Sequence, residues 1–434
     1  MTEDTTPNSR PYAWFVLFMM VLLYLVNYAD RYVAVGLLEE IQSTYQVSNS
    51  YMGFLVGPAF AIVYTLLAIP IARLADRHNR VRIIAAGAII WSAFTVLSGL
   101  AETPLTFALS RLGVGVGEAA FLAPAFSILS DYFAPQKRAL AFAVLNFGVY
   151  FGQIFGLVGG AAIAEASTWQ NAFLVLGIPG IILAIATLAL VREPVRGRLD
   201  PVLPTDSSNQ ISFKDAFKAL WSKRSFRFMT LGTAFGAFAS YGFGFWAPTL
   251  FARAFDLTPK VAAARYGGPS FIAGITGALA LGFLCDKLAS RDARWPFRLC
   301  AIGLSGFCTT MLILCFTKSV NFATLLTFPA GLMAGGWVIA MQAALQDLLP
   351  AKIRATGTSI WAFALTFSGM ALGVQFVGVA TDGIATLLGD NSGHMDIRYA
   401  MTITLLVCIP AIIFIILAGK SFEQDRIALA KEIG

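Results

Sequence analysis

The sequence predicts an all-α polytopic membrane protein, with twelve transmembrane helices arranged in two pseudo-symmetric six-helix bundles. Composition, recurring apolar stretches and an internal repeat lead to this fold class. Of the 434 residues, 57% are hydrophobic and 13% are charged, whereas a soluble domain carries about 25% charged residues. Apolar stretches of about 18 residues or more recur along the chain, and each is long enough to cross the hydrocarbon layer as a helix.

Twelve such spans can be assigned, six on either side of a polar linker. In the first half they cover residues 12–38, 51–74, 82–101, 105–132, 139–164 and 170–191. In the second half they cover residues 226–252, 262–285, 296–316, 321–349, 354–381 and 399–419. The predicted domains are bundles over 12–191 and 226–419, with an N-terminus (1–11), a linker (192–225) and a C-terminus (420–434) outside them. A short amphipathic helix is expected in the linker near "FKDAFKALW".

The distribution of basic residues predicts the orientation. Most lysines and arginines fall at the termini and in the loops after spans 2, 4, 6, 8 and 10, and cytoplasmic loops carry such an excess. Both termini are therefore predicted to be cytoplasmic, in an inner or plasma membrane. The net charge of +7 then reflects topology, and no nucleic-acid partner is expected. The first eleven residues lack the basic region of a cleavable signal peptide, and a monomer is expected.

An internal repeat relates the two halves. The loop "ARLADRHNRVR" follows span 2, and "GFLCDKLASR" follows span 8. Span 4 ends in "SDYFAPQKRA" and span 10 in "QDLLPAKIRA", with the same spacing from aspartate to arginine. Gly152 and Gly156 in span 5 match Gly369 and Gly373 in span 11. Landmarks in the same order predict a parallel duplication of six spans, as in many transporters.

The loops after spans 2 and 8 resemble the major facilitator superfamily signature G-x-x-x-D-[RK]-x-G-R-[RK]. This sequence has Ala72 and Asn79 in place of two glycines in the first copy, and Ala289 and Ser290 in place of the last Gly-Arg in the second. "NYADRY" in span 1 together with "RLGVGVGEAAF" in span 4 is similar to the Spinster-like branch of lysolipid and sphingolipid transporters. The resemblance implies alternating access and facilitative or proton-linked transport of amphipathic lipids, such as sphingoid phosphates and lysophospholipids.

Four charged residues lie deep inside spans, away from the span ends: Asp30 and Arg31 in span 1, and Arg111 and Glu118 in span 4. A charge near the bilayer centre costs about 2.5–3.5 kcal/mol, so such residues usually face a cavity or a partner. Arg111 and Glu118 are seven residues apart and share a helix face. Counting residues from the outer ends of the spans places Asp30 at a depth between them, so we expect these three side chains to cluster. Arg31 points about 100° away from Asp30, towards either the cavity or an unidentified partner.

These charges suggest a coupling mechanism. Arg111, with Arg31 as a second cation, is expected to bind an anionic substrate group, while Asp30 and Glu118 exchange protons. A carboxylate in an apolar cavity favours its neutral form, and a nearby arginine favours the ionised form, so substrate binding and protonation would be linked. No cofactor is expected, and the proton gradient would supply the driving force. The alternative is a closed ion-pair network that only holds spans 1 and 4 together.

Spans 7 to 12 contain no charged group at comparable depth but are rich in aromatic residues. We expect an apolar wall that would contact the tail of an amphipathic substrate, while its head contacts the N-terminal half. The residues of this apolar wall are Tyr241, Phe243, Phe245, Trp246, Trp337 and Met341. The alternative for each is ordinary helix packing.

The charged residues of the loops are expected to form cytoplasmic latches that stabilise one alternating state, or else solvated clusters. They are Asp76, Arg77, Arg80, Asp131, Arg138, Asp286 and Asp347. The glycines of "GVGVG" in span 4 should permit close helix packing. No metal-binding spacing or nucleophile motif is present, so an enzyme is not expected. Other functions left open are a carrier of small organic anions, a multidrug exporter and a receptor or scaffold without transport activity.

Overall fold

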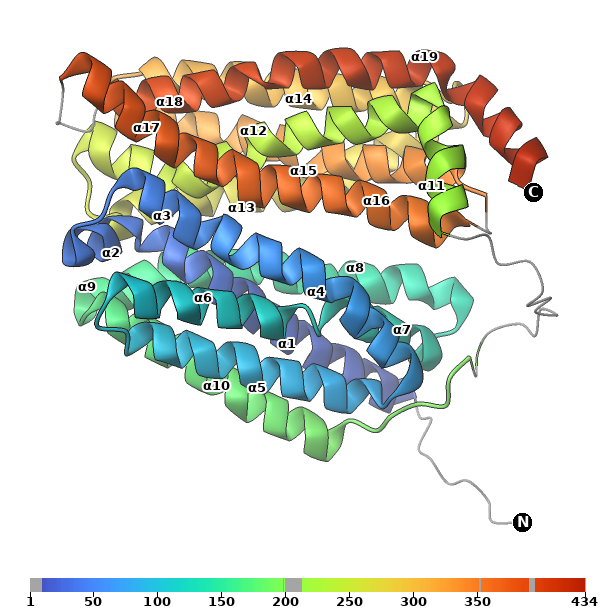
Figure 1. Ribbon diagram of the computed structural model, residues 1–434, viewed down its shortest axis with the longest axis horizontal. Coiled ribbons are helices and arrows are strands. Elements are labelled where there is room, and N and C mark those ends of the chain that lie inside the picture. The colour runs from blue at the N-terminus through green and yellow to red at the C-terminus, as the bar shows by residue number, and fades with distance from the viewer. Residues whose placement is uncertain (1–9, 198, 200–212, 351–352, 390–394, 434) are drawn as a thin grey trace. The chain divides into compact units, whose positions relative to one another are not determined.

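The computed structural model describes residues 10–433 except 198, 200–212, 351–352 and 390–394, and these residues form helices and turns without a strand (Figure 1). The first half contains α1 (Arg10–Gly36), α2 (Leu38–Tyr45), α3 (Asn49–Val56), α4 (Pro58–Arg77), α5 (Arg80–Gly99), α6 (Pro104–Glu118), α7 (Leu122–Tyr132), α8 (Pro135–Ile154), the π-helix η1 (Phe155–Gly159), α9 (Gly160–Ala166) and α10 (Trp169–Leu190). The second half contains α11 (Phe213–Ser222), α12 (Arg224–Phe255), α13 (Pro259–Ala289), α14 (Trp295–Phe316), α15 (Val320–Leu348), α16 (Arg354–Thr366), the π-helix η4 (Phe367–Gly373), α17 (Val374–Leu388), α18 (Met395–Leu406) and α19 (Cys408–Ile433).

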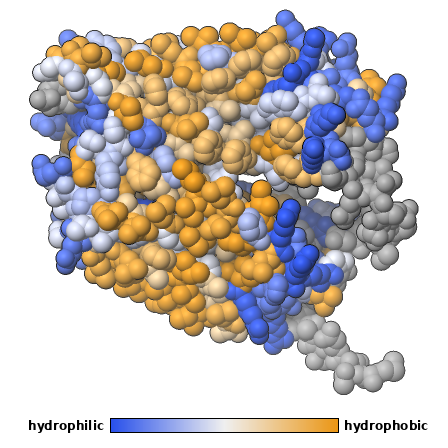
Figure 2. Space-filling model, viewed as in Figure 1, coloured by the Kyte–Doolittle hydropathy of each residue, from blue (hydrophilic) through white to orange (hydrophobic). Residues whose placement is uncertain are grey.

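Each predicted span corresponds to one helix or to helices joined end to end. Among the described residues, eleven helical stretches are long and apolar enough to cross a membrane. The helix at the seventh predicted span, α12, is 32 residues long but is not among the eleven; its sequence mixes phenylalanine with glycine, serine and threonine. Apolar side chains cover the middle of the helices, and hydrophilic ones gather near the helix ends (Figure 2).

The two π-helices interrupt spans 5 and 11, the positions that the internal repeat matches. In both, a glycine lies against the first helix of its own half. A Cβ on Gly156 would come within 2.4 Å of the Ala29 carbonyl oxygen in α1, and a Cβ on Gly373 within 2.2 Å of the Phe238 carbonyl oxygen in α12. Only glycine permits these approaches without a backbone shift, so the duplicated glycines make equivalent helix contacts in the two halves.

By their internal contacts the residues form two units: Met1–Tyr45 with Ile62–Pro204, and Gln46–Ala61 with Thr205–Gly434. Span 2 is divided between them, because α3 packs on α17 in the second unit. The break between α3 and α4 falls at Gly57, directly before the first residue of α4, Pro58. The predicted bounds of the two six-helix bundles, 12–191 and 226–419, are not tested by this division and remain a prediction.

The carboxylate of Asp382 in α17 binds the beginning of α3. Its Oδ1 accepts hydrogen bonds from the backbone N (3.1 Å) and Nδ2 (2.7 Å) of Asn49. Its Oδ2 accepts from the backbone N (2.7 Å) and Oγ (2.5 Å) of Ser50. Arg253 in α12 donates to Asn49 Oδ1 at 2.9 Å. Because the first N–H groups of a helix have no partner within the helix, this carboxylate acts as their cap.

Replacing Asp382 with alanine should therefore destabilise the second unit. Loss of a side-chain cap costs about 0.5–2 kcal/mol, and we expect a decrease of this size in the free energy of unfolding, measured by thermal denaturation of the purified protein. Glu423→Ala is the control, because Glu423 pairs with Arg426 at the surface and such pairs contribute about 0–1 kcal/mol. A melting temperature unchanged by Asp382→Ala would contradict the capping role.

Candidate functional site

Four charged side chains are buried together within the first unit. Asp30 and Arg31 lie near the C-terminal end of α1, and Arg111 and Glu118 lie on α6. Asp30 is 0% exposed, Glu118 1%, Arg111 2% and Arg31 8%. All four also lie within helical stretches long and apolar enough to span a membrane. Such burial is tolerated only where charges compensate one another.

Arg31 forms an ion pair with Glu118: its Nη2 donates a hydrogen bond to Oε2. The guanidinium carbon of Arg31 also lies 4.7 Å from the ring centroid of Tyr28 and 5.5 Å from that of Tyr64. These distances fit cation–π contacts, which strengthen when the cation is removed from water. Arg31 is thus held by one carboxylate and two aromatic rings, which identifies the partner that its direction on α1 left open.

Asp30 and Arg111 interact with this pair electrostatically, without direct hydrogen bonds. Nε and Nη1 of Arg111 have no hydrogen-bond partner among the described residues. Both side chains lie close enough to Glu118 for Coulombic interaction, they interact with each other in the same way, and Asp30 also interacts with the Thr95 hydroxyl. The structure therefore brings the expected cluster together, with Arg31 as the direct partner of Glu118 and with hydrogen-bonding capacity unused at Arg111.

Close packing of α6 on α5 places Glu118 at this depth. A Cβ on Gly117 would come within 2.4 Å of the Trp91 backbone N, and one on Gly113 within 2.3 Å of the Phe94 ring. Gly113 and Gly117 of "GVGVG" thus pack closely against α5, as the sequence indicates for this stretch. Helix α6 ends at Glu118.

Tyr28 and Tyr64 are site residues that sequence reasoning did not single out. Tyr28 stands inside the motif "NYADRY", and Tyr64 lies in the middle of span 2. Tyr28 continues an aromatic series along α1, with its ring centroid 5.1 Å from that of Tyr24 and 6.4 Å from that of Tyr32. The spacing of four residues places these tyrosines on one helix face, and this periodicity was the signal that could have found Tyr28.

The apolar wall lies in α12 and α15, and all of its residues except Tyr241 are at most 2% exposed. Trp246 Nε1 donates a hydrogen bond to the Val374 carbonyl oxygen at 2.9 Å. Trp337 packs against Gly236. In this structure the five buried residues of the apolar wall pack between helices of the second unit. Of its six residues, Tyr241 alone is half-exposed.

Among the described residues no cluster of three or more His, Cys, Asp or Glu is placed to hold a metal ion.

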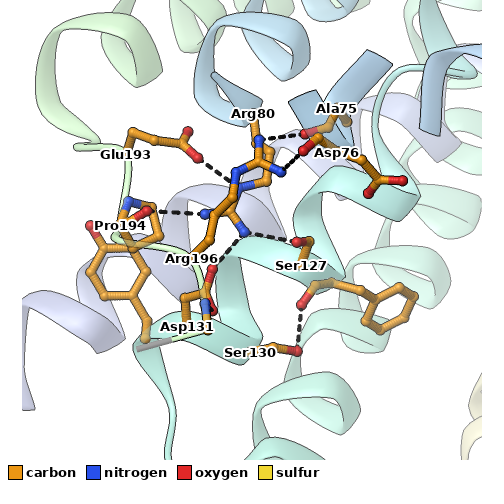
Figure 3. Close-up of polar contacts among 12 residues, drawn as sticks. Ala75, Asp76, Arg80, Ser127, Ser130, Asp131, Glu193, Pro194 and Arg196 are labelled. Carbon is orange, nitrogen blue, oxygen red and sulfur yellow. Dashed lines mark hydrogen bonds and ion pairs between the residues drawn. The ribbon is translucent and has the colours of Figure 1, made fainter. Parts of the chain in front are cut away.

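The predicted latch residues of the first repeat centre on Arg80, which is 1% exposed (Figure 3). Its Nη1 donates to Asp131 Oδ2 (2.5 Å) and Ser127 Oγ (2.7 Å), its Nε to Glu193 Oε1 (2.6 Å) and its Nη2 to the Pro194 carbonyl oxygen (3.1 Å). All three guanidinium nitrogens are therefore bonded. This network ties α5 to α7 and to the segment after α10.

Arg196 is a further member of this network that sequence reasoning did not predict. It donates to the carbonyl oxygens of Ala75 (2.6 Å), Asp76 and His78 at the end of α4. Gly197 N donates to the second oxygen of Asp131 at 2.9 Å. The signal was the charged stretch "REPVRGR", which directly follows the apolar residues of span 6.

The remaining latch residues differ between the repeats. Arg77 and Asp347 are exposed, and the side chain of Asp286 lies outside the described residues.

Arg138 donates from Nε to the Phe133 carbonyl oxygen at 3.1 Å, and Arg354 donates to the Leu349 carbonyl oxygen at 3.2 Å. These two arginines therefore have equivalent roles at the ends of α7 and α15. The position matching Arg80 is Ser290, whose Oγ donates to the Lys287 carbonyl oxygen at 2.8 Å. Within the part of the chain that the structure describes, the buried network is therefore found in the first repeat.

Truncating Arg80 should destabilise the first unit strongly. Removing one partner of a buried ion pair costs about 3–5 kcal/mol, because the other charge remains buried without compensation. We expect Arg80→Ala to lower the free energy of unfolding by this amount in thermal denaturation, and Arg77→Ala, at an exposed arginine of the same loop, to change it little. Equal losses in the two variants would contradict the structural role of Arg80.

Glu40 in α2 is a titratable group outside the spans. It is half-buried, and its Oε2 has no hydrogen-bond partner among the described residues. Burial, with a smaller contribution from repulsion by Glu39, raises the pKa of Glu40 from its ordinary 4.5 to about 7. The folded protein therefore holds this proton at pH values where the unfolded chain has released it.

This raised pKa predicts that stability falls as pH rises from about 4.5 to about 7, because the folded state binds more protons in that range. Glu40→Gln should remove this part of the pH dependence. The difference in melting temperature between wild type and variant should grow across the range and become constant above it. Glu102→Gln, the same change at an exposed loop position, is the control. Parallel pH profiles for wild type and Glu40→Gln would contradict the prediction.

Comparisons with known proteins agree with this architecture. The family model of the Major Facilitator Superfamily matches residues 20–374. The chain is 28% identical over 389 residues to an MFS-type efflux pump of Mycolicibacterium smegmatis, covering 89% of each chain. It is 26% identical to the sphingosine-1-phosphate transporter SPNS2 of Danio rerio, covering 94% of this chain and 84% of that one. A crystal structure of a bacterial homologue of the human lysosomal transporter Spinster, inward-facing and unoccupied, has a TM-score of 0.87 at 29% identity, covering 96% of this chain and 99% of that one.

Proposed function

Since the chain belongs to the Major Facilitator Superfamily and is a Spinster-like membrane transporter rather than an enzyme, we propose that it moves an amphipathic lipid by proton-coupled alternating access. The substrate class is a lysophospholipid or a sphingoid phosphate. The observation that carries this proposal is the buried ion pair between Arg31 and Glu118. The similarity to a sphingosine-1-phosphate transporter supports the lipid class.

The ion pair supplies a mechanism in which a lipid phosphate and Glu118 compete for Arg31. A guanidinium binds phosphate and carboxylate with the same bidentate geometry. When a phosphate binds Arg31, Glu118 loses its counter-charge in a low-dielectric environment and takes up a proton. When the phosphate leaves, Arg31 returns to Glu118 and the proton is released. Substrate and proton binding are therefore linked through one arginine.

Arg111 and Asp30 extend this exchange. The unused donors of Arg111 provide a second cation for a phosphate with two negative charges. Asp30, buried near Glu118 and Arg111, provides a second proton acceptor. Tyr28 and Tyr64 keep Arg31 in place while its anionic partner changes, because cation–π contacts do not require the carboxylate.

A second candidate is export of diverse drugs, which the similarity to an efflux pump of M. smegmatis favours. A carrier of small organic anions would use the same arginines as counter-charges. The two anion hypotheses differ in the tail: a lipid carrier needs a long apolar chain, whereas a small-anion carrier does not. The cytoplasmic position of both termini, predicted from the distribution of basic residues, forms part of the proposal.

Proton flux into proteoliposomes tests the proposed function. Addition of a lysophospholipid or a sphingoid phosphate should start a proton flux in wild type, and Glu118→Gln should reduce that flux to the level of empty liposomes, because a glutamine cannot exchange the proton. Glu102→Gln, at an exposed loop position, is the matched control and should behave like wild type.

Three outcomes separate the hypotheses. Flux driven by long-chain but not by short-chain phosphates supports the lipid carrier, and flux driven by both supports the small-anion carrier. Full flux in Glu118→Gln would remove Glu118 from proton coupling while leaving the substrate class intact.

A further inference from the structure

The short helix α11 exposes a row of aromatic side chains beside a row of lysines. Phe213, Phe217 and Trp221 follow one another at four-residue intervals and are 61%, 39% and 37% exposed. Their rings stack, with centroids 6.4 Å apart between Phe213 and Phe217 and 5.5 Å apart between Phe217 and Trp221. Lys214 and Lys218 are also exposed and lie about 100° further round the helix.

The side of α11 that borders the aromatic row and faces away from the lysines packs against the second unit. Ala216 and Leu220 are 1% and 0% exposed, and they lie about 100° round the helix from the aromatic row, away from the lysines. Leu220 packs against Gly357 in α16. The junction with α12 is fixed by an ion pair of 2.5 Å between Lys223 and Glu432 in α19. The packing of Ala216 and Leu220 and the ion pair at Lys223 therefore fix the orientation of α11, and its aromatic row faces outward.

The position and length of α11 place it at a membrane interface. It runs across the ends of α12 and α16, not alongside them (Figure 1). Its ten residues extend about 15 Å, half of the roughly 30 Å needed to cross the hydrocarbon layer. Aromatic residues with an apolar body gather at the boundary between lipid headgroups and acyl chains, and lysines beside them reach the headgroup phosphates.

We propose that α11 is an interfacial anchor for anionic phospholipid: Phe213, Phe217 and Trp221 enter the boundary between headgroups and acyl chains, and Lys214 and Lys218 pair with lipid phosphates. The lipid surface is the occupant because α11 adjoins the ends of helices that span the membrane. The charge of the lysine row is complementary to an anionic headgroup. This site is separate from the transport site in the first unit, and it binds lipid that is not transported.

An environment-sensitive fluorophore attached at position 217 tests the proposal on the full-length protein. The five native cysteines are buried, so Phe217→Cys can be labelled selectively, with unsubstituted protein as the blank. Asp215→Cys is the matched control, because Asp215 is exposed and lies about 160° round α11 from Phe217. In phosphatidylcholine nanodiscs with added phosphatidylglycerol, the label at 217 should shift to shorter wavelength and be quenched by brominated acyl chains. The label at 215 should remain water-exposed.

A second pair of substitutions tests the role of charge. Replacing Lys214 and Lys218 with glutamine in the labelled protein should weaken the affinity of α11 for phosphatidylglycerol by roughly fivefold per lysine, so that the shift needs a higher phosphatidylglycerol fraction. Equal emission from the labels at 217 and 215 would overturn the proposal. So would burial of the 217 label that does not depend on phosphatidylglycerol, because that result would show a cover other than anionic lipid.

Discussion

Burying charge in a medium of low dielectric constant is the constraint on which the first unit depends. Glu118 and Arg31 are stable at their depth because each neutralises the other. The glycines of α6 bring Glu118 to this depth through contact with α5, so a larger residue there would move a charge as well as a helix. Helix packing and electrostatics therefore constrain the same residues.

Two buried arginines in this unit illustrate opposite uses of the same chemistry. Arg80 donates to two carboxylates, a hydroxyl and a carbonyl. If its guanidinium moved, all four hydrogen bonds would be broken. Arg111 instead retains donors without hydrogen-bond partners among the described residues. Full bonding favours a rigid joint, whereas unused bonding capacity favours exchange of partners. This contrast supports the proposal that Arg111 takes part in substrate binding, while Arg80 stabilises the structure.

The sequence predicts the spans well because hydropathy and length act locally, and it identifies the four buried charges because each interrupts an apolar stretch. It does not predict that Arg31 pairs with Glu118, since that contact depends on how α1 is rotated against α6. Nor does it predict the role of Arg196, because a segment after a span can fold back on any nearby helix end. The burial of Trp246 and Trp337 depends on neighbours supplied by other helices, so an aromatic pattern alone cannot separate a binding wall from a packed core.

The two repeats share their glycine contacts and their helix-end arginines, yet among the described residues the cluster of four buried charges and the Arg80 network lie in the first. Each buried charged group has a desolvation cost that its partners must offset. In the proposed proton-coupled mechanism one such site is enough, and a second copy would double the desolvation cost without adding a new function. The helix contacts stabilise both halves and are kept in both, whereas the charge cluster is costly in each copy, so this mechanism favours asymmetry between the repeats.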